Sequence, residues 1–347
     1  MGGEVKRLMP LHRHLCFLDV GHGNSTVIIA GEDGIVVVDT GRRHSILSEF
    51  FLEQGITHVR SIYLSHADAD HVGGLLGILT TQEVSIGRVY LNRDASKKSK
   101  VWDDLVYELS LADNDGLLEF KIGLTSGHHE DLPGDVSVEV LGPSQYLVAK
   151  GVGSINRSGT IIYSNSISAV IAISVGSSTV ALLPGDVDGV GLSDLFRNPQ
   201  QDLSSKILVY PHHGGAPGAG TTPEEFAKKL LSEVRPDLVI FSIGRGKYST
   251  PNPDMVGHLR QLLPQTRMIC TQLSGHCADH LPAVQPTHLS ETIAAAGREY
   301  RACCGGTVVV PLDNVSAVQP QKVPHIEFIQ NHAPTSLCLE HLPLEQE

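Results

Sequence analysis

The chain has 347 residues, 41% of them hydrophobic and 18% charged, a composition that excludes fibrous and disordered classes. Lysine and arginine number 26 against 38 aspartates and glutamates, so the net charge of −12 excludes a protein that coats nucleic acid with its whole surface. Apolar runs such as residues 169–173 are far shorter than the roughly 20 residues that cross a bilayer, and we expect no membrane contact. The N-terminal sequence does not read as a secretory signal, so the expected location is cytoplasmic.

Short β-branched runs bounded by Gly, Asp or Pro predict a series of strands, several of them followed by a helix. The predicted strands cover residues 15–20, 25–30, 34–39, 61–65, 88–91, 136–141, 168–175, 178–183, 207–210, 238–242, 268–271 and 307–310. The predicted helices cover residues 45–54, 69–81, 100–111, 189–196, 223–233 and 254–263. Two β-rich halves, joined by a Gly- and Ser-rich segment at 142–165, indicate stacked sheets with helices outside. We expect residues 1–312 to form one hydrolase domain and residues 313–347 a C-terminal extension.

The strongest chemical signal directly follows the apolar run at 62–64. Four side chains that can bind a cation lie within six residues there: His66, Asp68, Asp70 and His71. A turn at a strand end can direct such residues to one point, and this pattern predicts a metal site. The alternative is a polar turn in which Asp70 only stabilises the start of the following helix.

This tract resembles the H-x-H-x-D-H signature of the metallo-β-lactamase fold, with Asp68 at the third position. The variant is similar to the β-lactamase-like domain of ComEC/Rec2 DNA-uptake proteins and their stand-alone relatives. Other segments resemble that branch in order and spacing: residues 17–25, 36–41, 165–168, 183–186 and 210–214. The resemblance covers most of residues 15–310 and implies an α/β fold, the αββα four-layer sandwich.

The chemistry of the tract predicts a site for two metal ions. His66 and Asp68 would hold one ion, and Asp70 and His71 would hold the other. Two ions roughly 3.5–4 Å apart activate a bridging hydroxide and stabilise both the attacking and the leaving oxygen of an in-line displacement. That chemistry suits phosphodiester hydrolysis.

Later segments complete this predicted site. Asp186, at a strand end, would bridge the two ions, and either His212 or His213 would complete the second. Asp70 and Asp186 are therefore the predicted catalytic carboxylates. The family often uses zinc, but Asp68 makes the ligands richer in oxygen and favours manganese or magnesium. We expect one or two divalent ions, zinc or manganese, with magnesium also compatible.

Five further residues are expected to orient a metal ligand or to contact the substrate. By resemblance, Asp39 lies under the site and orients a ligand; the alternative is a plain turn aspartate. Asn165 and Ser166 occur where many family members supply another histidine, and Thr250 occurs where the ComEC-like branch carries one. Lys247 belongs to a basic cluster near the site.

Basic clusters follow three predicted strands: Arg42 with Arg43, Arg93 with Lys97, Lys98 and Lys100, and Arg245 with Lys247. A cationic rim around the metals would select a phosphate backbone, whereas solvated clusters would select nothing. We therefore favour a phosphodiesterase or nuclease with a nucleic acid or other phosphodiester substrate. The alternatives are a hydrolase of a small ester, lactone or cyclic nucleotide, and a catalytically silent interaction domain. The tract at 128–131, which contains two histidines and two acids, is interpreted as a polar surface loop.

A second group of metal-binding side chains lies near the C-terminus: Cys270, His276, Cys277, His280, Cys303 and Cys304. Antiparallel pairing of two predicted strands would bring Cys270 near Cys303, and the intervening residues would complete a structural zinc site. The alternative is a set of buried free thiols.

Overall fold

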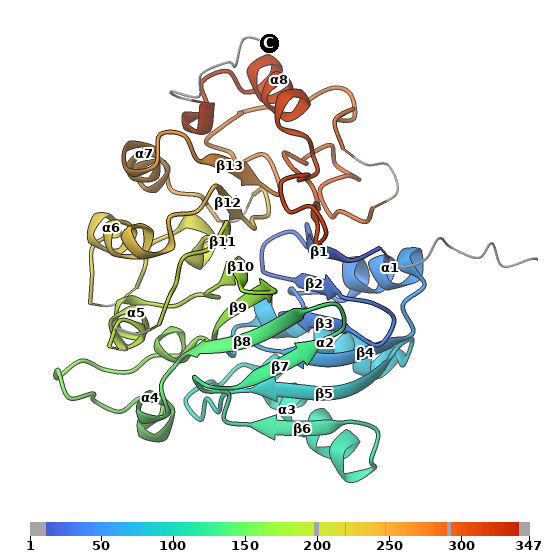
Figure 1. Ribbon diagram of the computed structural model, residues 1–347, viewed down its shortest axis with the longest axis vertical. Coiled ribbons are helices and arrows are strands. Elements are labelled where there is room, and N and C mark those ends of the chain that lie inside the picture. The colour runs from blue at the N-terminus through green and yellow to red at the C-terminus, as the bar shows by residue number, and fades with distance from the viewer. Residues whose placement is uncertain (1–11, 198–200, 219, 247, 290–292, 340–347) are drawn as a thin grey trace, which may run out of the picture.

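Two mixed β-sheets face each other in the protein (Figure 1). The structure, a computed structural model, describes residues 12–197, 201–218, 220–246, 248–289 and 293–339. In these residues the first sheet has seven strands, in the order β14 (Val308–Pro311), β1 (His14–Phe17), β2 (Thr26–Ile29), β3 (Ile35–Val38), β4 (His58–Tyr63), β5 (Ser85–Leu91) and β6 (Glu119–Ile122). The second described sheet also has seven, in the order β13 (Arg267–Cys270), β12 (Leu238–Phe241), β11 (Ile207–Val209), β10 (Ser178–Leu183), β9 (Val170–Val175), β8 (Val136–Gly142) and β7 (His129–Leu132).

Both sheets combine antiparallel pairs with parallel pairs. Strands β14, β1, β2 and β3 pair antiparallel, and β3 to β6 pair parallel. Strands β7 to β10 pair antiparallel, and β10 to β13 pair parallel. The helices that connect the parallel strands are α1 (Ser45–Gln54), α2 (Ala69–Thr81) and α3 (Lys100–Asn114) in the first half, and α5 (Gly189–Leu195), α6 (Pro223–Val234) and α7 (Pro253–Leu262) in the second.

Three apolar cores hold these layers together. Successive strand side chains point to opposite faces, so Val37 packs with Leu75 of α2 while Val38 faces the second sheet. Between the sheets, Val38 belongs to the same buried cluster as Ile171 of β9. The outer face of the second sheet packs on α5 to α7, for example through Leu230, and Figure 1 shows these helices along that side. The layers are therefore helix, sheet, sheet and helix, which confirms the predicted αββα sandwich.

Each predicted strand and helix has a counterpart whose ends lie within three residues of the predicted ones. The interpretation of residues 128–131 as a surface loop is wrong, because residues 129–132 form β7. Glu130 is buried there and accepts hydrogen bonds from Arg60 Nε at 2.7 Å and Tyr63 OH at 2.6 Å. A charge neutralised in this way can face a core, and a hydrophobicity pattern does not reveal it.

The C-terminal segment adds helix α8 (Lys322–His332), which was not predicted. Its Phe328 and Ile329 join the core on the outer side of the second sheet. The boundary at residue 312 stays a prediction. Among the described helices, none combines the length and the apolar character needed to cross a membrane.

Candidate metal centre

Side chains that can bind metals follow the ends of four strands from both sheets. Asp39 follows β3, His66 follows β4, Asp186 follows β10 and His213 follows β11, and Asp70 and His71 lie in the first turn of α2. The carboxyl ends of parallel strands meet at one edge of a sheet. Because the two sheets face each other, their residues meet there.

Three of these residues form the first ligand group: His66, His71 and Asp186. One ligand atom from each lies within 4.8 Å of the other two, and all three residues are buried. His71 Nε2 is 3.5 Å from Asp186 Oδ1, and His66 Nε2 is 4.0 Å from Asp186 Oδ2.

The second ligand group consists of His22, Asp70 and His213, whose ligand atoms also lie within 4.8 Å of one another. Asp70 Oδ2 is 3.4 Å from His22 Nε2 and 3.5 Å from His213 Nε2. His213 Nε2 is also 3.8 Å from Asp186 Oδ2. The Asp186 carboxylate therefore lies between the two groups, which is the position that a shared ligand needs.

Each buried histidine is held by one ring nitrogen and directs the other toward the carboxylates. His71 Nδ1 is 2.7 Å from Asp39 Oδ2, His213 Nδ1 is 2.7 Å from the Ser242 carbonyl oxygen, and His66 Nδ1 is 3.0 Å from Ser65 Oγ. The Nε2 atoms of all three rings are buried and have no hydrogen-bond partner. Metal-ligating histidines are commonly anchored in this way. A buried polar atom without a partner costs roughly 1–3 kcal/mol, so these residues fit a pair of divalent cations.

The protonation states of His22, His66, Asp70 and Asp186 suit cation binding. For His71, burial alone would lower the pKa, but Asp39 and Asp186 raise it well above its usual value. Burial lowers the pKa of His22 and of His66 to about 4, so both rings are neutral at neutral pH and have a free lone pair. Burial alone would raise the pKa of Asp186, but His213 and His71 hold it well below its usual range. The pKa of Asp70 is likewise lowered by His213 and His71 against the effect of burial.

The backbone around the site is unusual at several points. Asp39, His212 and His213 have φ angles of 58°, 52° and 56°, in the left-handed region that residues other than glycine seldom adopt. A Cβ on Gly23 would overlap the carbonyl oxygen of Asp70, so only glycine allows the His22 loop to lie this close to α2. The fold thus accepts local strain to bring the ligand groups together.

The two groups of converging ligand atoms cut across the predicted pairs, and which ligands share an ion stays a prediction. His66 was paired with Asp68 and Asp70 with His71, but His66 lies with His71, and Asp70 lies with His213. His71 Nε2 faces Asp186, whereas Asp70 Oδ2 faces His22 and His213. Asp68 Oδ2 is 3.9 Å from His66 Nε2, and its Oδ1 forms an ion pair with Lys97.

Sequence reasoning missed His22. It lies between two glycines in the loop after β1, inside the segment 17–25 that carried part of the resemblance. Of the two candidates after β11, His213 belongs to the second ligand group. His212 instead holds Asp186, because its backbone N–H donates to Asp186 Oδ1 at 3.0 Å and its Nε2 lies 3.1 Å from the Val187 carbonyl oxygen.

The other predicted residues lie around this centre. Asp39 also accepts hydrogen bonds from the Ser65 N–H at 2.7 Å and from Ser65 Oγ at 2.8 Å. Ser166 Oγ donates to Asp188 Oδ2 at 2.6 Å. The Thr250 carbonyl accepts from Ser274 Oγ at 2.9 Å, while its own Oγ1 is buried without a hydrogen-bond partner. Lys247 lies outside the described residues.

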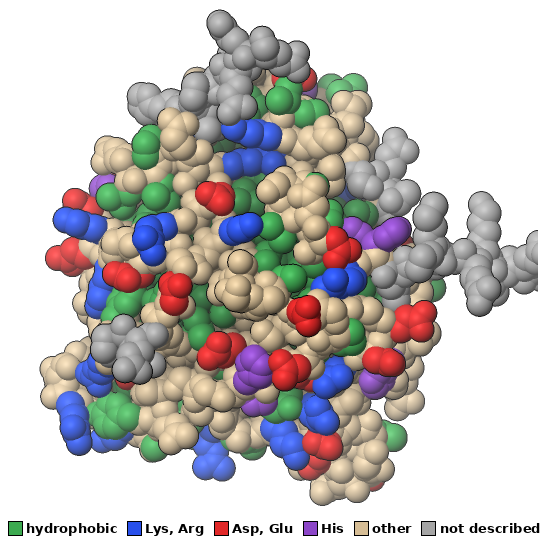
Figure 2. Space-filling view, in the orientation of Figure 1, with side chains coloured by type: hydrophobic (Ala, Val, Ile, Leu, Met, Phe, Trp, Pro, Cys, Tyr) green, Lys and Arg blue, Asp and Glu red, His purple; other side chains and the backbone are tan. Residues whose placement is uncertain are grey.

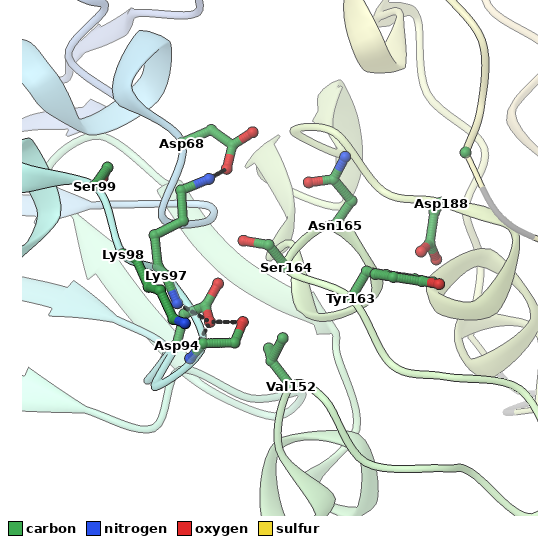
Figure 3. A pocket seen from close by; sticks show the side chains of 12 residues that line it. Asp68, Asp94, Lys97, Lys98, Ser99, Val152, Tyr163, Ser164, Asn165 and Asp188 are labelled. Carbon is green, nitrogen blue, oxygen red and sulfur yellow. Dashed lines mark hydrogen bonds and ion pairs between the residues drawn. The ribbon is translucent and has the colours of Figure 1, made fainter.

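A cavity of about 620 Å³ borders the first ligand group and is called the first cavity here. Figure 3 shows Lys97 reaching Asp68 on one side, with Tyr163, Ser164 and Asn165 on the other. The two sides come from different halves of the chain. Lys98 also lines this cavity.

Within the described residues, the side chains of the predicted structural zinc site form no group of three converging ligands. Cys303 Sγ donates to Asp19 Oδ2 at 3.5 Å, whereas Cys304 Sγ lies 3.3 Å from His325 Nε2. The two neighbouring thiols therefore contact different partners. Burial also raises the pKa of Cys270, Cys303 and Cys304, which keeps these thiols protonated. The remaining members, His276, Cys277 and His280, belong to no group of three converging ligands in the described chain.

Sequence comparisons agree with this geometry. Residues 18–155 match the sequence model of the metallo-beta-lactamase superfamily. The chain is 24% identical over 264 residues to ComE operon protein 3 of Bacillus subtilis (strain 168), a match that covers 70% of this chain and 30% of that protein. It is 27% identical over 235 residues to Recombination protein 2 of Haemophilus influenzae, covering 66% of this chain and 24% of that protein. The chain thus spans less than a third of the length of either relative.

Among solved structures, the fold is similar to Igni18, a metallo hydrolase from the archaeon Ignicoccus hospitalis. The TM-score is 0.41 at 14% sequence identity, and the match covers 72% of this chain and 91% of the other.

Proposed function

Because the chain contains a hydrolase domain of the metallo-β-lactamase superfamily, we propose that it is a metal-dependent phosphodiesterase that acts on nucleic acid. One observation carries the proposal: the Asp186 carboxylate lies between two groups of buried ligands, each able to hold a divalent cation. Cations bound at such paired sites stabilise the attacking and leaving oxygens of an in-line phosphoryl displacement.

The residues of the chain have distinct roles in this proposal. His66, His71 and Asp186 would hold one ion, and His22, Asp70 and His213 the other. Asp39 orients His71 by accepting a hydrogen bond from its Nδ1–H, so that Nε2 faces the site. Asp68, in its ion pair with Lys97, lies at the border of the first cavity.

The ligand chemistry favours zinc or manganese. Four imidazoles and two carboxylates make up the two groups. Imidazole suits zinc, whereas carboxylates suit manganese and magnesium. We expect zinc or manganese to bind more tightly than magnesium.

The basic residues at the first cavity support a phosphodiester substrate. Lys97 and Lys98 line this cavity beside the first ligand group, where cationic side chains can position phosphate oxygens. The name of the Haemophilus influenzae relative, Recombination protein 2, refers to a process of nucleic acids. Both observations favour nucleic acid over a neutral ester or lactone.

A small substrate is the second candidate. The first cavity, at about 620 Å³, falls in the size range of pockets for small molecules, which suits a cyclic nucleotide or a lactone. A catalytically silent interaction domain is the third candidate function. Three buried imidazole nitrogens without hydrogen-bond partners reduce stability, and a domain that binds no metal would gain nothing from them.

The test compares substrates at saturating zinc, manganese or magnesium. We expect hydrolysis of bis(p-nitrophenyl) phosphate and of labelled oligonucleotides, and loss of both activities in Asp186→Asn. Cleavage of a cyclic dinucleotide or a lactone alone would favour the small-substrate function. A protein with full metal content that hydrolyses no phosphodiester would overturn the proposal.

A further inference from the structure

A second cavity borders the other side of the metal centre. Its volume is about 570 Å³. The residues that line it include His22, Arg42, Arg43, Tyr248, Glu299 and Tyr300. His22 belongs to the second ligand group, whereas Asp68 of the first cavity lies beside the first group. No lining residue is common to the two cavities. The two cavities therefore border different ends of the paired site.

The second cavity presents cationic groups that the fold does not use. Arg42 and Arg43 are exposed, and within the described residues their guanidinium groups form neither a hydrogen bond nor an ion pair. Arg245 of the same cavity is different, because its two terminal nitrogens donate to four backbone carbonyl oxygens between residues 273 and 279. Glu299 is the acidic residue of the cavity. The two free arginines give it a net positive charge.

The first cavity also offers a cation, although it contains more carboxylates. Asp68 is paired with Lys97, and Asp94 accepts hydrogen bonds from Ser96 and from the Lys97 backbone. Asp188 caps α5 by accepting from the N–H groups of two of its residues. These carboxylates are engaged within the protein, and Lys98 remains exposed without a partner among the described residues.

Exposed tyrosines accompany the cations in both cavities. Tyr163 in the first cavity is 48% exposed, and Tyr248 and Tyr300 in the second are 39% and 64% exposed. The Tyr248 ring stacks on His22, with 4.0 Å between centroids. Exposed aromatic rings beside cations are the usual means of binding unpaired bases and their phosphates, since every base has a face that can stack.

These features are local rather than a property of the whole surface. Figure 2 shows acidic and basic side chains interspersed over one face of the molecule, in keeping with the net charge of −12. With a net charge of −12, a long double helix would meet an excess of acidic groups outside the cavities, whereas a single strand can follow a narrow path.

We propose that a single-stranded nucleic acid lies across both cavities, with an internal phosphodiester at the metal centre, so that the enzyme cuts within a strand. This inference rests on the proposed function, because the strand is the substrate of the same site. Arg42 and Arg43 contact phosphates on one side of the cut, and Lys98 does so on the other. Tyr300 and Tyr163 stack bases on the two sides.

The first experiment measures binding without metal, in excess chelator, by fluorescence anisotropy of labelled oligonucleotides. The ligands are single-stranded DNA, single-stranded RNA and duplex DNA of the same sequence, titrated over a range of salt. We expect both single strands to bind more tightly than the duplex. Comparison of the single-stranded DNA with the single-stranded RNA shows whether the protein prefers deoxyribose or ribose. Tighter binding of the duplex, or no binding of any strand, would overturn the proposal.

Substitutions then test each cavity. Arg42→Ala with Arg43→Ala should reduce the slope of log affinity against log salt by roughly 1.4, since each lost contact with a single strand removes roughly 0.7. Tyr300→Ala should weaken binding by roughly fivefold or more, the effect of losing one stacked base. The matched controls are Lys100→Ala for Lys98→Ala and Tyr107→Ala for Tyr300→Ala. Tyr107 is 63% exposed and lines neither cavity.

The second experiment follows the products. A strand labelled at one end should yield internal cuts, and an oligonucleotide series should show that cleavage falls as the strand becomes too short to reach both cavities. Release of single nucleotides from one end only would overturn the proposal. Hydrolysis of bis(p-nitrophenyl) phosphate without binding of strands would also overturn the proposed single-stranded substrate. That result would still agree with the proposed phosphodiesterase activity. If no phosphodiester is hydrolysed, the proposed function fails, while the metal-free binding still decides whether strands bind.

Discussion

The chain carries two clusters of residues that can bind metals, and in the described residues the converging groups belong to the first of them. At the edge of the sandwich, histidines and aspartates from both sheets form two ligand groups around Asp186. Near the C-terminus, Cys303 and Cys304 turn to separate partners, Asp19 and His325. The difference lies in how each side chain is held. The histidines are anchored by one nitrogen and leave the other unpaired, whereas these thiols already have partners.

This contrast shows that closeness in sequence does not make a metal site. A converging site needs fixed strand ends, a second atom that orients each ligand, and a buried atom left without a partner. Five substitutions test the contrast, and they are ordered by the size of the effect that we expect.

Asp186→Ala should have the largest effect. It removes the carboxylate between the two groups, so we expect hydrolysis to fall to background and the metal content per chain to decrease. Activity is measured with bis(p-nitrophenyl) phosphate, and metal content by mass spectrometry of the dialysed protein. Asp131→Ala, at an exposed aspartate on β7, is the control. Normal metal content and activity in Asp186→Ala would show that the two groups do not act together.

His22→Ala should lower the metal content by about one ion per chain, because only the second ligand group loses a member. His129→Ala, which removes a half-exposed histidine, should change nothing. If His22→Ala retains every ion with unchanged affinity, His22 is not a ligand, and the second group must be completed in another way.

Asp39→Asn isolates the orientation of His71. Asparagine tolerates the left-handed backbone at this position, so the substitution changes the hydrogen bond to His71 with little strain. We expect metal affinity to fall by roughly 10- to 100-fold, as for other residues that position a ligand. Asp135→Asn, at an exposed aspartate with the same backbone conformation, is the matched control. Equal metal affinities for Asp39→Asn and Asp135→Asn would show that Asp39 does not orient His71 for metal binding.

The cysteine variants should have the smallest effects and leave the metal content unchanged. Cys270→Ser places a buried hydroxyl where the thiol has no hydrogen-bond partner among the described residues, and we expect a loss of roughly 1–3 kcal/mol in the free energy of unfolding. Cys303→Ser should cost less, because Asp19 can accept from the new hydroxyl. Thermal and denaturant unfolding measure both values. Loss of a bound zinc ion in either variant would restore the structural zinc site.

The sequence was sufficient to predict the fold and the main metal-binding tract. Apolar runs that end at Asp39, Ser65 and Leu183 marked strands whose ends lie at one edge, and the family resemblance added their order. Which ligand atoms lie close together depends on contacts between the two sheets, such as those of Asp186 with His71 and His213. A local pattern does not contain such contacts.

Two other features could not be predicted from the sequence, for related reasons. His22 is the one histidine in its loop, and it joins Asp70 because glycine at position 23 allows close approach of the backbone. Glu130 has the polarity of a surface residue but is buried against Arg60 and Tyr63. In both cases the deciding contact is made with a residue far away in the chain.

Anomalous X-ray diffraction from crystals grown with manganese and with zinc tests the central claim most directly. We expect two anomalous peaks, each from one bound ion. One should lie among His66, His71 and Asp186 and the other among His22, Asp70 and His213, with the Asp186 carboxylate between them. A single peak away from Asp186, or a peak at the C-terminal cysteines with none at the sheet edge, would contradict this claim.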